Sequence, residues 1–155
     1  MGLTIVRILR NHILGIYVDV PSAALAIKGK PDPAAALIAA DSVPKTLQLI
    51  IQYGKLTPTQ LSDALKERME PILGTGSKDL AAFASSFDGK TLKSGLSITF
   101  SASAKGELTT ALDGVVASKI TSAPLVRALF AVYLGDNPVS NDYKSEVIKG
   151  LSKIV

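Results

Sequence analysis

The sequence predicts an α+β fold in which one antiparallel sheet packs against a layer of helices. Segments rich in Ile and Val occupy the early and middle parts of the chain, a hairpin cluster comes late, and helices with recognisable caps lie between them. The 155 residues have the length of one domain, and 47% hydrophobic and 19% charged residues are typical of a globular protein with a core. We therefore expect a single domain over residues 1–155. Its N-terminus is expected to be trimmed or unusually short, because a strand is predicted from Thr4.

The predicted strands are segments in which β-branched and other apolar residues dominate. They cover residues 4–10, 13–20, 45–51, 96–102, 107–112 and 115–119. The first two segments form either two strands or one long bent strand, and Tyr17 is expected in the core. Gly106 supplies the positive φ that a tight turn before the fifth strand needs, and Asp113-Gly114 marks the turn after it.

The predicted helices begin at residues that are typical N-caps, namely Asp32, Thr57, Ser122 and Ser140. Gln60 lies three residues after Thr57, as in a capping box. The helices cover residues 23–27, 34–40, 58–69, 78–85, 123–134 and 141–153.

The C-terminal ends of two helices and the residues on one helix face can also be predicted. Pro71 is expected to stop the third helix, and Gly135 is expected to end the fifth. The spacing of Leu61, Leu65 and Arg68 places them on one face of the third helix.

Composition excludes several kinds of site. The chain has no cysteine, which excludes disulfides, thiol nucleophiles and thiolate metal ligands. Its one histidine, His12, excludes a multi-histidine metal site, and no Gly-x-Ser-x-Gly motif accompanies it. The net charge is +4, but the basic residues are scattered and do not interleave with aromatics, so we expect no nucleic-acid binding. No apolar run approaches the roughly 20 residues of a membrane span.

Four segments of the chain resemble the chalcone isomerase family. They are HILGIYV (12–18), LTPTQLS (56–62), SITFSASAKGEL (97–108) and SKITS (118–122). The resemblance covers most of the chain and is strongest over residues 95–135. It implies an open-faced β-sandwich with a ligand cleft between the large sheet and the helices. That fold hosts flavonoid-forming isomerases and fatty-acid-binding proteins, so individual residues must decide between them.

The resemblance assigns the polar positions of the isomerase cleft residue by residue. The arginine of the isomerases that polarises the substrate would fall before residue 1 of this chain. His12 takes the place of a hydroxyl residue of the isomerases. Gln52 replaces a lysine, Leu61 a tyrosine and Arg68 an asparagine, while Ser122 keeps the hydroxyl that contacts the flavonoid. One of six polar positions is kept, and the loss of the others should remove most of the electrostatic stabilisation that catalysis needs.

The candidate ligand-binding residues are His12, Gln52, Leu61, Arg68, Thr121 and Ser122. We predict no catalytic residue. Thr121 and Ser122 are equally explained as helix caps, and Arg68 as a solvated helix charge. The resemblance implies that the fatty-acid-binding branch anchors a carboxylate with an arginine and a tyrosine, and His12 stands at the place of that tyrosine.

The sequence therefore predicts a non-catalytic or weakly catalytic protein that binds an apolar ligand, a fatty acid or a flavonoid, in the cleft. One alternative is a chalcone isomerase, an intramolecular lyase, with an altered residue set. Another is a non-enzymatic scaffold with a vestigial cleft. We expect a monomer without cofactor, metal or membrane span. The compartment stays open between cytoplasm and plastid stroma.

Overall fold

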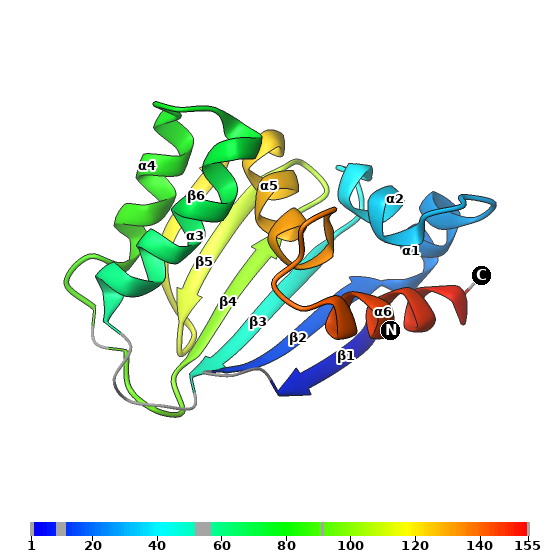
Figure 1. Ribbon diagram of the computed structural model, residues 1–155, viewed down its shortest axis with the longest axis horizontal. Coiled ribbons are helices and arrows are strands. Elements are labelled where there is room, and N and C mark those ends of the chain that lie inside the picture. Colours follow the sequence, from blue (N-terminus) through cyan, green and yellow to red (C-terminus); the bar gives the residue numbers. More distant parts are fainter. Residues whose placement is uncertain (1, 9–11, 52–56, 91, 155) are drawn as a thin grey trace.

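One sheet forms the base of the molecule (Figure 1). The computed structural model describes residues 2–8, 12–51, 57–90 and 92–154, with side chains from Leu14 onward. Within these residues the sheet has six antiparallel strands, and strands that follow one another in sequence are neighbours in space. They are β1 (Gly2–Ile8), β2 (His12–Asp19), β3 (Lys45–Ile51), β4 (Ser97–Ala102), β5 (Glu107–Leu112) and β6 (Val115–Thr121).

The first two strands form a hairpin pair. They pair along their whole length, from Gly2 opposite Asp19 to Ile8 opposite Ile13. The alternative of one long bent strand is therefore wrong, because antiparallel partners run in opposite directions. The last strand is longer than predicted and includes Thr121.

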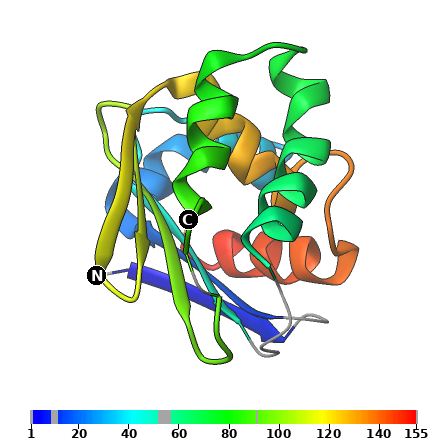
Figure 2. The ribbon, with the colours of Figure 1, turned by 90° about the vertical axis from the view of Figure 1, so that its left-hand side faces the viewer.

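A layer of helices covers one face of the sheet (Figure 2). The described helices are α1 (Val20–Ile27), α2 (Pro33–Ala39), α3 (Pro58–Leu73), α4 (Lys78–Ala84), α5 (Ala123–Leu134) and α6 (Asn141–Ser152), with a 3-10 turn η1 (Ser85–Phe87). The side chains of Asp32, Thr57, Ser122 and Ser140 each accept a bond from a backbone N–H of the first turn. These N-caps and the α+β fold class are confirmed.

Pro71 does not stop α3, which runs on to Leu73. The expectation was wrong because a proline in the last turn removes only the bond to the Glu67 carbonyl, and Glu67 is exposed to water. The helix ends instead at Gly74, whose φ is 89° and whose N–H donates to the Glu70 carbonyl.

The core lies between the sheet and the helices. Leu47, Leu49 and Ile51 are buried, while the residues between them are half-buried on the other face, as the alternation of a strand requires. Helix α5 is buried almost all round, so it forms the centre of the helical layer.

The opposite face of the sheet is open and polar. Tyr17 lies there, half-buried, and its hydroxyl donates to Gln48 Oε1 at 2.9 Å. Gln48 in turn donates to Ser97 Oγ at 2.9 Å. The prediction of Tyr17 as a core residue was wrong, because its position in β2 alternates with the buried Leu14, Ile16 and Val18.

None of the helices in the described ranges is long and apolar enough to cross a membrane.

Candidate functional site

A small apolar pocket lies between the sheet and two helices. Its volume is about 170 Å³. Strand β3, helix α3 and helix α5 contribute its walls, with Leu49, Ile51, Gln60, Leu61, Ala64, Leu65, Arg68, Val132, Tyr133 and Val139 as lining residues. The pocket thus lies where the resemblance placed the ligand cleft, between sheet and helical layer.

Local sequence determines how α3 presents this wall. The Thr57 hydroxyl accepts from the Gln60 N–H at 3.0 Å, and the Gln60 side chain accepts from the Thr57 N–H at 2.9 Å. This capping box fixes the first turn of the helix. Leu61, Leu65 and Arg68 then recur at helical spacing on the face toward β3 and α5, and the two leucines are buried.

Arg68 brings a positive charge to the edge of the pocket. Its side chain is exposed, and its Nη1 donates to the Asn137 carbonyl at 3.2 Å. A guanidinium has five N–H donors, so one bond to a carbonyl leaves most of them free for an anion.

Tyr133 is a second polar residue of the pocket beside Arg68, and Gln60, whose side chain belongs to the capping box, is the third. Tyr133 is 4% exposed, and within the described residues its hydroxyl has no hydrogen-bond partner. Burial raises the pKa of Tyr133 above its usual value, and the charge of Arg68 opposes that shift. The phenol is therefore neutral near pH 7 and can donate a hydrogen bond. A tyrosine hydroxyl in a largely buried position normally finds a partner, so this donor is available to a polar atom that enters the pocket.

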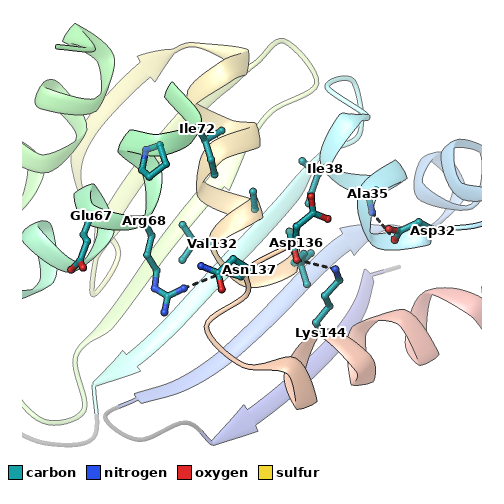
Figure 3. A pocket seen from close by; sticks show the side chains of 14 residues that line it. Asp32, Ala35, Ile38, Glu67, Arg68, Ile72, Val132, Asp136, Asn137 and Lys144 are labelled. Atoms are coloured by element: carbon teal, nitrogen blue, oxygen red, sulfur yellow. Dashed lines mark hydrogen bonds between the residues drawn. The ribbon is translucent and has the colours of Figure 1, made fainter. Parts of the chain in front are cut away.

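A larger cleft adjoins the pocket and shares Arg68 and Val132 with it (Figure 3). Its volume is about 620 Å³, and it lies between α2, α3, α5 and the segment leading to α6. Lys144 closes one side by donating to the Gly135 carbonyl at 2.8 Å. Gly135 is required there, since a Cβ would lie 2.6 Å from the Ala131 carbonyl oxygen.

The structure brings two of the predicted binding residues together, since Leu61 and Arg68 both line the apolar pocket. His12 pairs with Ile51, itself a lining residue, through the backbone of β2 and β3. Gln52 lies outside the described residues, so its predicted role stays a prediction.

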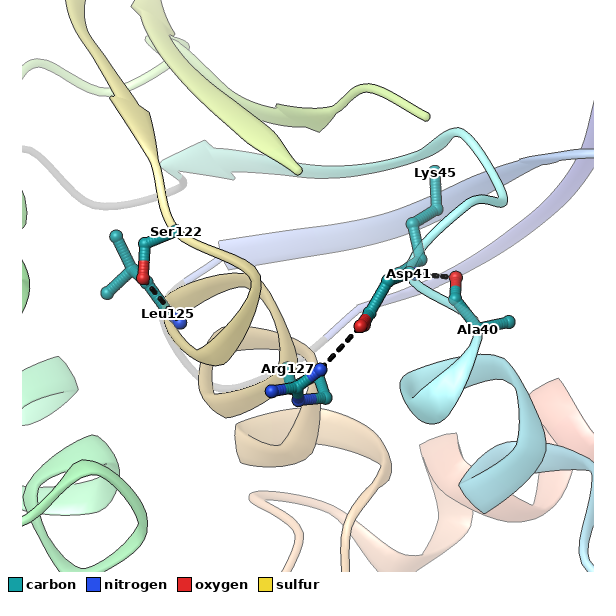
Figure 4. Close-up of polar contacts among 6 residues, drawn as sticks. All are labelled: Ala40, Asp41, Lys45, Ser122, Leu125 and Arg127. Carbon is teal, nitrogen blue, oxygen red and sulfur yellow. Dashed lines mark hydrogen bonds and ion pairs between the residues drawn. The ribbon is translucent and has the colours of Figure 1, made fainter. Parts of the chain in front are cut away.

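Thr121 and Ser122 are placed elsewhere. Ser122 begins α5, where its hydroxyl accepts from the Leu125 N–H at 3.2 Å (Figure 4). Thr121 is exposed at the end of β6. Val132 lies ten residues further along α5, which at about 1.5 Å per residue puts the pocket about 15 Å away. The structure thus gives Ser122 the capping role and does not place either residue at the pocket.

Tyr133 was missed by sequence reasoning. It stands inside the apolar run of α5, where nothing in the local pattern separates it from the core residues beside it. One signal could have pointed to Tyr133. A helix that is apolar all round is expected to be buried, and a tyrosine within it has a hydroxyl that needs a partner.

The arrangement defines a class: an α+β protein with a mostly apolar pocket whose lining includes a cation and a neutral hydroxyl. No group of three metal-ligating side chains occurs within the described ranges. The model of the chalcone isomerase-like family matches residues 11–148, and the chain belongs to that family.

Comparison with solved structures gives the same fold. A crystal structure of a fatty-acid binding protein from Arabidopsis thaliana superimposes with a TM-score of 0.76 over 99% of this chain and 87% of that chain, at 19% identity. No curated protein matches the chain by sequence. The open-faced sheet with one helical layer, which the resemblance implied, is confirmed.

Proposed function

We propose that this protein binds a fatty acid without transforming it, in the pocket between β3, α3 and α5. The observation that carries the proposal is that Arg68 and Tyr133 both line a cavity whose other described lining residues are apolar except for Gln60. A fatty acid needs a charged donor for its carboxylate and apolar walls for its chain. The pocket has a charged donor, Arg68, and apolar walls among its lining residues.

The energetics favour such a ligand. A hydrogen bond between charged groups contributes about 1.5–3 kcal/mol, and a neutral one about 0.5–1.5 kcal/mol. Each methylene that leaves water for the walls contributes about 0.8 kcal/mol. Leu49, Ile51 and Leu61 are each at most 8% exposed, so the walls are part of the core and need no rearrangement.

Two comparisons support the proposal. The chain belongs to the chalcone isomerase-like family, and a protein of the same fold is named as a fatty-acid binding protein. A flavonoid suits this pocket less well. Its about fifteen carbon atoms, at about 30 Å³ each, need about 450 Å³, whereas the pocket holds about 170 Å³.

A ligand panel on delipidated protein tests the proposal. Saturated carboxylates, length-matched alcohols, a chalcone and its flavanone are compared by thermal shift and calorimetry. A ligand that binds only the folded state at one hundred times its Kd adds about 2.7 kcal/mol of stability. We expect carboxylates to raise Tm more than the alcohols do. A response to the flavonoids alone would instead favour the isomerase alternative, and no response at all the scaffold.

A further inference from the structure

The size of the pocket and the place of its polar groups together restrict the ligand further. We propose that the site selects medium-chain carboxylates, with a tail of about six carbon atoms, over long-chain fatty acids. The inference rests on the proposed function, because it assumes that a carboxylate occupies the polar end.

The position of Arg68 sets the direction in which the ligand lies. Arg68 stands at the border, lining both the apolar pocket and the larger cleft. A carboxylate bound there has apolar walls on one side. On the other side it has the cleft, whose lining includes apolar side chains such as Ile38 and Ile72 but also five charged ones, Asp32, Glu67, Arg68, Asp136 and Lys144 (Figure 3). In the smaller pocket Arg68 is the one charged lining residue among those described, so the tail enters that pocket, where it removes water from fewer charged groups.

The volume of the pocket then limits the tail. A methylene group is about the size of a water molecule, whose share of the liquid volume is about 30 Å³. The pocket of about 170 Å³ accordingly takes about six such groups. Heptanoate and octanoate fit, whereas the tail of a sixteen-carbon acid exceeds the space more than twofold.

The walls oppose enlargement of the pocket. Leu49 and Ile51 belong to a central strand paired on both sides, and Val132 lies on the buried helix α5. Moving any of them disturbs a close-packed core, and such cores deform little. Helix α3 contributes the residues that can be varied, because Ala64 lines the pocket and is exposed.

A chain-length series tests the inference. Calorimetry with unbranched carboxylates from butanoate to dodecanoate should show affinity rising about fourfold per carbon, which corresponds to about 0.8 kcal/mol per buried methylene. We expect the rise to stop near octanoate. A rise that continues to dodecanoate would overturn the chain-length limit and leave the proposed function standing. Absence of binding at every length would overturn both.

Two substitutions should move the limit in opposite directions. Ala64→Leu adds three carbons at the pocket, so octanoate affinity should fall at least tenfold while butanoate is little affected. Leu65→Ala removes three carbons, so the limit should move toward decanoate or beyond. Ala81→Leu, at an exposed position of α4 that lines neither cavity, is the matched control and should leave the series unchanged. An unchanged limit in both pocket variants, with folding verified by circular dichroism, would contradict the inference.

Discussion

Two regions of the molecule hold a cation beside the core, and they differ in the groups that the cation contacts. Lys45, at the start of β3, is 2% exposed, and its Nζ donates to the Ala40 carbonyl at 2.9 Å (Figure 4). The same Nζ lies 5.6 Å from the centroid of the Phe130 ring. Arg68 reaches one backbone carbonyl from the rim of a cavity, beside a tyrosine hydroxyl without a partner.

On the proposed function, this difference separates a structural cation, Lys45, from a ligand-binding one, Arg68. Near Lys45, Arg127 forms an ion pair with Asp41, so the protein itself supplies a negative charge close to these cations. At the pocket, within the described residues, Arg68 has one carbonyl acceptor and the Tyr133 hydroxyl has none. On the proposed function a ligand carboxylate would accept from both, whereas the buried atom without a partner near Lys45 is an acceptor, Asp41 Oδ1.

The largest expected effect is on stability at the first region. Lys45→Ala removes the buried stem, the ring contact and the donor to the Ala40 carbonyl, and should cost about 2–4 kcal/mol. Urea unfolding measures it, with Lys66→Ala on the surface of α3 as the control expected within about 0.5 kcal/mol. Octanoate affinity should be unchanged. A variant that keeps its stability but loses binding would reverse the assignment of the two regions.

The next effect is on binding at the second region. Arg68→Gln should weaken octanoate binding at least tenfold, because a charged hydrogen bond contributes about 1.5–3 kcal/mol. Octanol, which has no charge, should bind the variant and the parent alike. The matched control is Arg127→Gln, which breaks the ion pair with Asp41 and should leave the calorimetric affinity intact. Equal losses in both arginine variants would remove the distinction.

Tyr133→Phe sharpens the comparison further. Octanoate affinity should fall about two- to tenfold, the value of a neutral hydrogen bond of about 0.5–1.5 kcal/mol. The free energy of unfolding should stay level or rise, because the substitution removes a hydroxyl without a partner.

Tyr17→Phe is the opposite case, since it deletes the bond to Gln48 on the open face. It should lower stability and leave binding unaffected. A Tyr133→Phe variant with unaltered affinity would contradict contact between hydroxyl and ligand.

The smallest effect is a dependence on pH. Burial lowers the pKa of Lys45 below the usual 10.5, with nearby Asp41 raising it and Arg127 lowering it. Between the lowered value and 10.5 the unfolded chain binds more protons than the folded one, so this group makes stability rise with pH in that window. Burial raises the pKa values of Tyr133 and Tyr143, which makes stability fall above about pH 10.

Urea midpoints measured from pH 7 to about pH 11 check this prediction. In Lys45→Met the rise should be absent, while the loss above about pH 10 should persist because the two tyrosines are unchanged. A rise of the same size in parent and variant would show that other groups cause it.

Local sequence was sufficient for most of the fold. Caps such as Asp32 and Thr57, and the turn at Gly106 with φ of 81°, act within a few residues, so their effect can be read from the chain. Pro71 was misjudged because its cost depends on whether the carbonyl of Glu67 can reach water. Tyr17 was misjudged because strand alternation alone does not say which face is covered.

The site could be predicted only in part, for a physical reason. Leu61 and Arg68 were candidates because the family resemblance places them at cleft positions, and helical spacing puts both on one face of α3; both line the pocket. Tyr133 joins them across sixty-five positions of sequence, through the packing of α5 on α3. Such a contact leaves no local pattern. Ser122 caps α5, and because one hydroxyl can serve both as a cap and as a ligand contact, its predicted binding role stays a prediction.

The order of the strands has a consequence for how this protein can diversify. Strands β3 and β4 are neighbours in the sheet, yet α3 and α4 are inserted between them. The chain leaves the sheet, builds one wall of the pocket and returns beside its point of departure. That excursion packs on α5 and on the sheet, where the Phe83 ring contacts the Phe100 ring of β4, but both of its ends lie at one place in the sheet. Changes in its length or side chains can reshape the cavity while the strand register stays in place, so selectivity can evolve separately from the scaffold that carries it.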